Sequence, residues 1–481
     1  MKLLVLALDG MDKGLAETFE MPFLQSLLAE RHQVDITEDL WGRGWTKVLS
    51  GKPATETGAF YEQPALDGTP TFTQKFGSGD YPIDPDMAPL WQRINDAGLR
   101  AAWLGPPTTL PAPSINGWFL AGAGGGFSPA GVIPELACTP ARLHASLAEH
   151  HFNWECRFVV SGIQNTDSFI EACEKAVVNR TNFLIKETSE EAAFDFAFYF
   201  EKETVILTNI YANYIVDSDL RQSPTFSRLS RFFLTLDQCI QRLSSSLNPE
   251  SVIVVSDHGL APLKRLYNLN RVLHPAGLLA TNTEDFKYSK KPCKEDLRTR
   301  LRKRIVQALA PHISKDLSPI ATPKGDAIDY AESQAFAHFY CPGVFVNDSR
   351  FGGPVADKDV LEVAKKSVDA INQNQQLRDA GFSARLFRSE YSRTRAKDLL
   401  PDVWCDAPID SFPEQRGEVL QPNPLYCDFE LLSRVPRDIG SGKKSPKALL
   451  AVEAKYADGL PASGDLTIAY DAILSHLGID S

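Results

Sequence analysis

The sequence predicts an α/β protein in which a central, mostly parallel sheet is flanked by helices on both faces. Short, wholly apolar runs, which are typical of buried parallel strands, alternate with segments whose apolar residues recur at helical spacing. Acidic residues directly follow two of the apolar runs. Ligands of open parallel sheets bind beyond the carboxyl ends of the strands, so these two observations also predict where a site would lie.

The predicted elements alternate along the chain. The apolar run 3–8 ends at Asp9 and Gly10, and it is too short for a signal peptide or a membrane span. Pro22 stands in the first turn of the next segment, where a helix tolerates proline. In chain order we predict a strand at 3–8, helices at 21–28 and 90–97, strands at 100–105 and 195–200, a helix at 226–247 and a strand at 252–255.

Composition restricts the possible partners. The chain has 481 residues, of which 43% are hydrophobic and 23% charged, as in ordinary soluble proteins. A net charge of −11 disfavours nucleic acid, because phosphate backbones need a basic surface. We expect neither a nucleic-acid nor a membrane partner, and a cytoplasmic location in which the eight cysteines stay free thiols. A local pocket could still hold a small anionic substrate; the sequence does not indicate the oligomeric state.

Two stretches are predicted to be insertions. Residues 1–263 and 325–481 are predicted to form the core, residues 264–324 an inserted cap, and residues 137–189 a helical insertion within the core. Many basic residues fall in the segment Lys287–Arg304. That segment is compatible with a solvated helix face or with a lid that attracts anions.

The candidate metal ligands stand at strand ends. Asp9 follows the first apolar strand, and Asp257 and His258 follow the strand at 252–255. Two carboxylate oxygens and one imidazole nitrogen suit Zn²⁺ or Mn²⁺ and leave a coordination position open. Taken singly, an acidic residue after a strand is as well explained as a loop cap.

The segment Val255–Gly259, which reads VSDHG, resembles the SDHG signature of the type I phosphodiesterases and nucleotide pyrophosphatases, in the alkaline phosphatase superfamily. The resemblance implies an alkaline-phosphatase-like fold and hydrolysis of phosphate esters by two metals and a Thr or Ser nucleophile. Other segments resemble further motifs of this family in the expected order, namely residues 8–10 with 21–24, 45–51, 58–60, 105–117, 328–347, 400–402 and 473–479.

The same resemblance shows where this chain departs from the family. The nucleophile position falls on Trp41, whose indole cannot form a covalent phosphoenzyme. The Asp and His of the second metal site correspond to Thr204 and Thr208, with Tyr211 following, and the last His corresponds to the segment 440–444, which has none. We therefore expect one metal site to be retained and the other lost, with one Zn²⁺ or Mn²⁺ ion or none.

Two functional hypotheses follow. In the first, the chain is a metal-dependent hydrolase of a small phosphate, sulfate or phosphonate ester. Arg43, near a predicted helix start, would bind an anion and assist catalysis, and Thr46 would replace the missing nucleophile. Thr109, Asn116 and His338 are further candidates for substrate binding, although structural hydrogen bonding is the default role of the first two and packing is the favoured role of His338. In the second hypothesis the chain is a degenerate family member that binds a ligand or acts as a scaffold.

Overall fold

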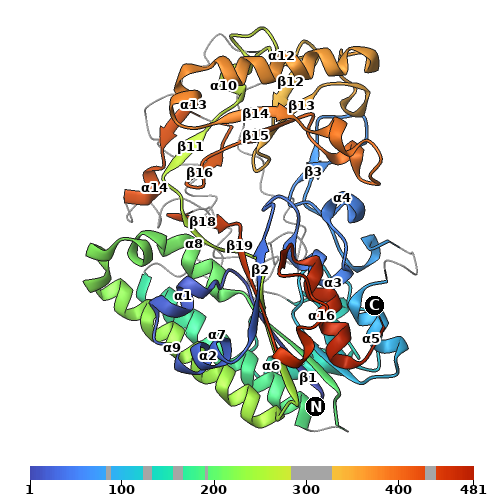
Figure 1. Cartoon of the computed structure of the whole chain (residues 1–481), viewed down its shortest axis with the longest axis vertical. Coiled ribbons are helices and arrows are strands. Elements are labelled where there is room, and N and C mark those ends of the chain that lie inside the picture. Colours follow the sequence, from blue (N-terminus) through green and yellow to red (C-terminus); the bar gives the residue numbers. More distant parts are fainter. Residues whose placement is uncertain are drawn as a thin grey trace, which may run out of the picture.

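A computed structural model gives the architecture of the chain (Figure 1). The residues that the structure describes are 1–82, 88–122, 133–154, 156, 166–189, 193–282, 328–415, 417–427 and 440–480.

A nine-stranded sheet forms the larger part of the described structure. Five neighbouring strands run parallel, which confirms the predicted sheet, and β19 lies antiparallel between β9 and β2. The strands lie in the order β20 (Ser463–Gly464), β2 (His32–Thr37), β19 (Lys447–Val452), β9 (Ser251–Ser256), β1 (Leu3–Leu8), β8 (Phe196–Glu201), β5 (Ala101–Leu104), β6 (Gly117–Leu120) and β7 (Cys138–Thr139).

The central strands are buried along their whole length. Every residue of β1, β8 and β9 is buried, so their side chains face protein on both sides of the sheet. This is why these strands appear in the sequence as unbroken apolar runs rather than as an alternation of polar and apolar residues.

Helices cover both faces of this sheet (Figure 1). One face carries α1 (Lys13–Thr18), α2 (Pro22–Ala29), α7 (Thr166–Ser189) and α9 (Pro224–Leu247), and the other α3 (Gly44–Ser50), α5 (Leu90–Asp96) and α16 (Thr467–Leu477). Each helix and strand predicted from the sequence appears with its ends shifted by no more than two residues. Ser223 begins α9 by accepting a hydrogen bond from the Phe226 amide, as helix N-caps do.

A smaller lobe stands beyond the carboxyl ends of the parallel strands (top of Figure 1). It has its own hydrophobic cluster, built mainly from residues 267–279 and 335–405. Its elements are α10 (Asn270–Leu273), α12 (Val360–Gln373), a four-stranded sheet of β12 (Ala335–Ala337), β13 (Gly343–Val346), β15 (Val403–Asp406) and β14 (Ser383–Leu386), and a three-stranded sheet of β16 (Ser411–Pro413), β11 (Arg265–Tyr267) and β17 (Leu420–Pro422).

The predicted domain boundaries stay a prediction. Of the proposed cap, residues 264–282 are described, and they pack with residues 328–427 in the smaller lobe. Residues 283–327, which include the basic segment Lys287–Arg304, lie outside the described residues. Within the proposed insertion 137–189, α7 packs along α9 as part of the helical layer. No helix in the described part of the chain is long and apolar enough to cross a bilayer.

Candidate metal centre

The strand register brings the predicted metal ligands together. β1 and β9 are parallel neighbours, with Ala7 opposite Val255, so Asp9 and Asp257 both follow two residues later at the same edge of the sheet. Ser256 ties the two loops to each other: its hydroxyl accepts from the Met11 amide and donates to the His258 carbonyl, both at 2.9 Å.

A close approach of the chain requires glycine at position 10. Gly10 has a φ of +74°, which turns the chain directly after Asp9. A Cβ there would lie 2.9 Å from the Val205 Cβ and 3.1 Å from the His258 Cε1. The absence of a side chain therefore lets the His258 ring lie against the loop that carries Asp9.

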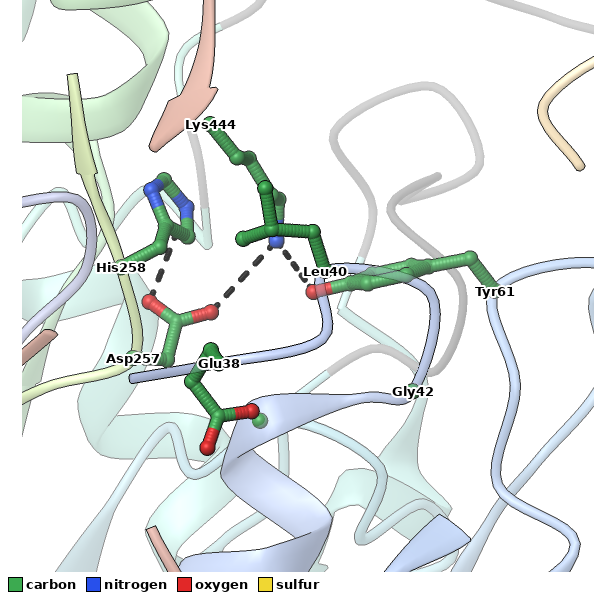
Figure 2. A pocket seen from close by; sticks show the side chains of 8 residues that line it. Glu38, Leu40, Gly42, Tyr61, Asp257, His258 and Lys444 are labelled. Atoms are coloured by element: carbon green, nitrogen blue, oxygen red, sulfur yellow. Dashed lines mark hydrogen bonds and ion pairs between the residues drawn. The ribbon is translucent and has the colours of Figure 1, made fainter. Parts of the chain in front are cut away.

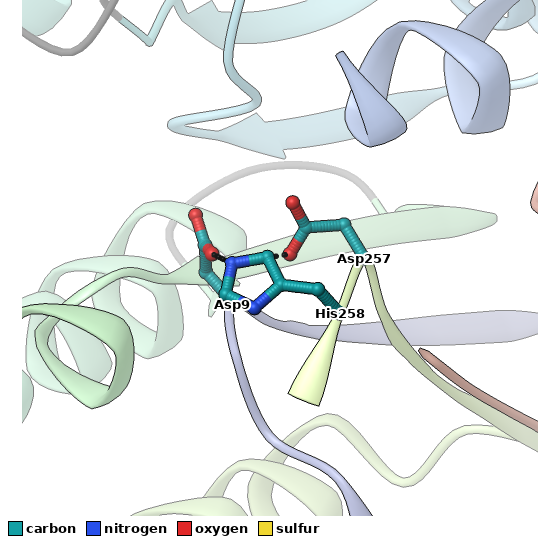
Figure 3. Close-up of side chains that lie close together, drawn as sticks. All are labelled: Asp9, Asp257 and His258. Carbon is teal, nitrogen blue, oxygen red and sulfur yellow. Dashed lines mark ion pairs between the residues drawn. The ribbon is translucent and has the colours of Figure 1, made fainter. Parts of the chain in front are cut away.

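Three ligand atoms converge at this edge (Figure 3). The His258 ring lies between the two carboxylates, with Nε2 3.2 Å from Asp9 Oδ1 and 3.7 Å from Asp257 Oδ1. All three side chains are buried, and these three atoms make no hydrogen bond to the described part of the chain. Buried polar atoms without a hydrogen bond are costly, so their convergence points to a missing partner. We call these residues the metal trio.

The trio fits a divalent metal. His258 Nδ1 lies 2.9 Å from the Gly259 carbonyl oxygen, which can only accept, so Nδ1 carries the proton and Nε2 offers a lone pair to the trio. In a tetrahedral site with metal bonds of about 2.1 Å, ligand atoms are separated by about 3.4 Å. The observed separations of 3.2 and 3.7 Å bracket that value. Among the described residues, this is the single cluster of three His, Cys, Asp or Glu side chains that could hold a metal.

The charges of the trio reinforce this assignment. Burial raises the pKa of Asp257, and the neighbouring charge of Asp9 raises it further. A cation bound beside these two carboxylates would offset their mutual repulsion.

One cation from the chain itself reaches the site (Figure 2). Lys444 lies on β18 (Gly442–Ser445), which pairs antiparallel with β10 (Gly259–Pro262), directly after the trio. The Lys444 ammonium lies 3.4 Å from Asp257 Oδ2, donates to the Tyr61 hydroxyl and stands 4.2 Å from the centre of the Tyr61 ring.

These side chains line a small recess. Its walls combine two members of the trio, Asp257 and His258, with the Lys444 ammonium and the side-chain-free surface of two glycines, so it is polar and narrow. The lining residues are Glu38, Leu40, Gly42, Gly44, Tyr61, Asp257, His258 and Lys444.

Trp41 does not line the recess. Its ring stacks on Phe60 with centroids 4.2 Å apart and lies 5.6 Å from the Trp404 ring, within the hydrophobic cluster of the smaller lobe. The neighbouring Leu40, at φ +64°, lines the recess instead. The indole therefore neither blocks the trio nor takes part in chemistry there.

Arg43 and Thr46 have structural contacts in this conformation. The Arg43 guanidinium is buried and donates to the carbonyls of Phe60 at 2.8 Å, Tyr61 at 3.3 Å and Gln74 at 2.7 Å. It thereby holds the segment that carries Tyr61 in place. Thr46 is buried with its hydroxyl 3.3 Å from that of Thr108, and neither it nor Arg43 lines the recess. Their predicted catalytic and anion-binding roles stay predictions.

The remaining predicted substrate ligands do not line the recess either. Thr109 is buried and donates to the Pro106 carbonyl at 2.6 Å, which stabilises the loop after β5. Partly buried His338 stacks on Phe72 with ring centroids 3.7 Å apart and lies 2.8 Å from Glu62. The prediction that Asn116 faces the site needs correction. Asn116 directly precedes β6, so it lies at the edge of the sheet opposite the trio, where its backbone N–H donates to Asn95 Oδ1 at 2.8 Å.

The segments assigned to a lost second metal site do lie beside the trio. The Thr204 hydroxyl donates to the Asp9 carbonyl, and the Thr208 hydroxyl is 3.3 Å from the Val205 carbonyl. Gly442 packs so closely on this helix, α8 (Glu203–Val216), that a Cβ would lie 2.6 Å from the Thr208 carbonyl oxygen. Here the chain provides backbone-bonded hydroxyls and, from the same strand as Gly442, the ammonium of Lys444. The sequence feature that could have indicated this cation is the lysine in the segment 440–444, where the family resemblance places a histidine.

A methyl group at position 44 is expected to disturb the trio. A Cβ on Gly44 would lie 2.8 Å from the Asp257 Cβ, so Gly44→Ala must displace that carboxylate. We expect a loss of metal affinity of about 10- to 100-fold, as for other changes that misplace a metal ligand. Calorimetric titration with Zn²⁺ and Mn²⁺ measures it. The matched control is Gly79→Ala, where nothing lies within 4 Å of the added methyl; equal affinities in both variants would contradict the prediction.

Comparison with known proteins gives the family. The family model for type I phosphodiesterases and nucleotide pyrophosphatases matches residues 3–329. The chain therefore belongs to this family, whose members are metal-dependent, and membership supports a phosphoester hydrolase. Comparison with curated protein sequences gives no significant match.

Solved structures share the fold at low identity. Murine ectonucleotide pyrophosphatase/phosphodiesterase 5 aligns with a TM-score of 0.50 and 12% identity over 100% of this chain and 95% of its own. The human protein of the same name gives 0.50 and 10% identity, over 100% and 96%. Phosphonoacetate hydrolase from Sinorhizobium meliloti 1021, solved with phosphonoformate, gives 0.52 and 11%, over 100% and 95%. At such identities these likenesses establish the alkaline-phosphatase-like fold and no more.

Proposed function

We propose that this protein hydrolyses a small phosphate or phosphonate ester, or the corresponding sulfate ester, with one divalent metal held by Asp9, Asp257 and His258. The observation that carries the proposal is the convergence of three buried ligand atoms that have no hydrogen-bond partner in the described part of the chain. A metal bound there would supply Lewis-acid activation of an ester oxygen and a nucleophile from water at neutral pH.

The chain's own residues prepare the site for such an ion. The Gly259 carbonyl fixes the His258 tautomer, and the Ser256 hydroxyl holds the loops of Asp9 and Asp257 together. Preorganisation of this kind means that the ligands need little rearrangement when an ion binds. A single ion is favoured because the far side of Asp257 is occupied by the Lys444 ammonium.

The nucleophile is proposed to be water. Among the described residues, those that line the recess include no serine, threonine or cysteine, and Trp41 points into the smaller lobe. Within that part of the chain, the recess therefore lacks the hydroxyl that the family resemblance assigns as the nucleophile. Thr46 remains the alternative, and Thr46→Val decides between them: activity survives if water attacks and is lost if the Thr46 hydroxyl does.

The recess favours a small substrate. It is narrow and lined mainly by charged and polar side chains, which favours one small anionic group over an extended ligand. A protein of the same fold, the phosphonoacetate hydrolase, was solved with the small anion phosphonoformate. This similarity supports a small anionic substrate here.

The experiment is a turnover screen. Metal-stripped protein is reloaded with Zn²⁺ or Mn²⁺ and offered a panel of phosphate, phosphonate and sulfate esters, alongside Asp9→Ala and the exposed-site control Asp67→Ala. We expect hydrolysis that is lost in Asp9→Ala and kept in Asp67→Ala, with one metal bound per chain. Two metals per chain would contradict the single-metal proposal.

The second candidate function is binding without turnover. It is favoured by the hydroxyls of Thr204 and Thr208, which are bonded to backbone carbonyls where the family resemblance places metal ligands. Metal binding without hydrolysis of any ester in the panel would support this candidate and reject the first.

A further inference from the structure

Lys444 is an enclosed cation that the proposed metal chemistry does not use. Its side chain is 19% exposed, and it contacts one trio carboxylate and the face and hydroxyl of Tyr61. The ammonium is thus held between a carboxylate oxygen and a phenol, at the wall of the recess.

The position of this charge is set by the backbone. Antiparallel pairing places Lys444 opposite Leu260, two residues after His258. Side chains alternate along a strand, so the preceding Lys443 points away from the recess and donates to the Ser411 carbonyl at 2.6 Å. One strand thus carries two neighbouring lysines, and of the two, Lys444 lines the recess.

The ammonium retains a donor for a ligand. A lysine ammonium has three N–H groups, and within the described residues its hydrogen bonds go to the Tyr61 hydroxyl and to Asp257 Oδ2. The third N–H can reach an anion in the recess that this side chain lines. Because Tyr61 accepts from Lys444, the phenol also keeps its own proton to donate.

The net charge of the site also favours the binding of an anion by Lys444. The two trio carboxylates and the ammonium sum to −1, and a divalent cation would bring the site to +1. Without Lys444 the loaded site would be neutral and would hold an anion less well. Conversely, Lys444 lies near the trio and disfavours the metal, because like charges repel.

We infer that Lys444 is the substrate-binding residue of the recess, where its ammonium binds an anionic phosphoryl or phosphonyl oxygen beside the metal trio. This inference rests on the proposed function and adds the group that recognises the substrate's charge. Dianionic monoesters and phosphonates gain more from this charge than monoanionic diesters.

The test compares substitutions at two neighbouring positions, one expected to change phosphate affinity and the other not. Lys444→Met and Lys443→Met are titrated with Zn²⁺, and the Zn²⁺-loaded proteins are then titrated with inorganic phosphate by calorimetry. For Lys444→Met we expect phosphate affinity to fall by about tenfold or more and Zn²⁺ affinity to stay the same or rise. Lys443→Met should change neither, and Lys444→Arg should keep most of the phosphate affinity because it keeps the charge.

The outcomes separate substrate binding from a structural role. Loss of phosphate affinity with Zn²⁺ affinity retained supports the inference, whether or not any ester is hydrolysed. Unchanged phosphate affinity in Lys444→Met overturns it, as does a parallel loss of both affinities, which would indicate a misfolded site. Wild-type protein that binds Zn²⁺ but no phosphate also overturns it. Turnover in the ester panel decides the proposed function separately.

Discussion

Replacing Asp257 with alanine is expected to abolish ester hydrolysis and to lower the affinity for divalent metal by on the order of 100-fold or more. Asp257 supplies one of the three convergent ligand atoms and lies fully inside the protein, so no other side chain of the trio can substitute for it. The loss should also appear as lost stabilisation by metal. At a free metal concentration of about 100 times the wild-type Kd, binding stabilises the wild type by about 2.7 kcal/mol, whereas a 100-fold weaker variant gains about 0.4 kcal/mol.

Thermal unfolding at rising Zn²⁺ or Mn²⁺ concentration measures this difference. The control is Thr204→Val, which removes a hydroxyl that donates to the Asp9 carbonyl but offers no atom to the trio. It tests whether any change beside the site weakens metal binding. A melting temperature that rises with metal equally in Asp257→Ala and in the wild type would place the metal elsewhere.

The trio could be predicted from the sequence because its geometry depends on little more than where two strands end and that these strands are neighbours. Asp9 and Asp257 each follow an unbroken apolar strand, and parallel strands present their carboxyl ends at one edge of a sheet. Once the two strands are neighbours, their register places the side chains together with no further contribution from the chain. The same argument accounts for the correctly predicted strands and helices, whose periodicity is a property of short segments.

The role of Lys444 could not be predicted in this way. It lies 187 residues beyond Asp257 and reaches it through the antiparallel pairing of β18 with β10. That pairing leaves no periodic signal in either short strand. β19 is similar: it enters antiparallel between β9 and β2, an arrangement that the alternation of strands and helices does not indicate.

The direction of a side chain and the path of a loop explain the other differences between the predicted and the observed site. Trp41 occupies the position that the resemblance assigns to the nucleophile, but stacking on Phe60 carries it into the smaller lobe. Thr109 and Asn116 lie on one loop, yet that loop runs from the end of β5 to the start of β6 and so crosses from one sheet edge to the other. A loop's residues share a site only where both of its ends lie at the same edge.

Replacing Arg180 with methionine is expected to destabilise the fold by about 3–5 kcal/mol, because it leaves two buried carboxylates without their cation. Arg180, on α7, donates to Glu201 Oε2 and Glu203 Oε2, both at 2.6 Å, and to Glu203 Oε1 at 3.0 Å. All three side chains are buried. Glu201 ends β8, and its carbonyl accepts from the Asp9 amide at 2.9 Å, so the cluster supports the strand edge that carries the trio.

The loss should depend on pH. In the wild type, burial raises the pKa of Glu201, whereas Arg180 outweighs burial and lowers that of Glu203. Without the guanidinium, burial and mutual repulsion raise both folded-state pKa values above the unfolded value of about 4.3. The folded variant then binds more protons than the unfolded chain, so its stability falls as pH rises above that value. Denaturant unfolding at pH 5.5 and pH 8 should show the larger deficit at pH 8.

An exposed ion pair between α7 and α9 provides the control. Arg231 on α9 donates to both carboxylate oxygens of Glu174 on α7, each at 2.8 Å, but its side chain is 56% exposed. Solvent screens that pair and replaces it when it is broken, so Arg231→Met should cost no more than about 1 kcal/mol and show little dependence on pH. Equal losses in the two variants would mean that the guanidinium–carboxylate contact itself, rather than the burial of unpaired charge, determines the stability of this layer.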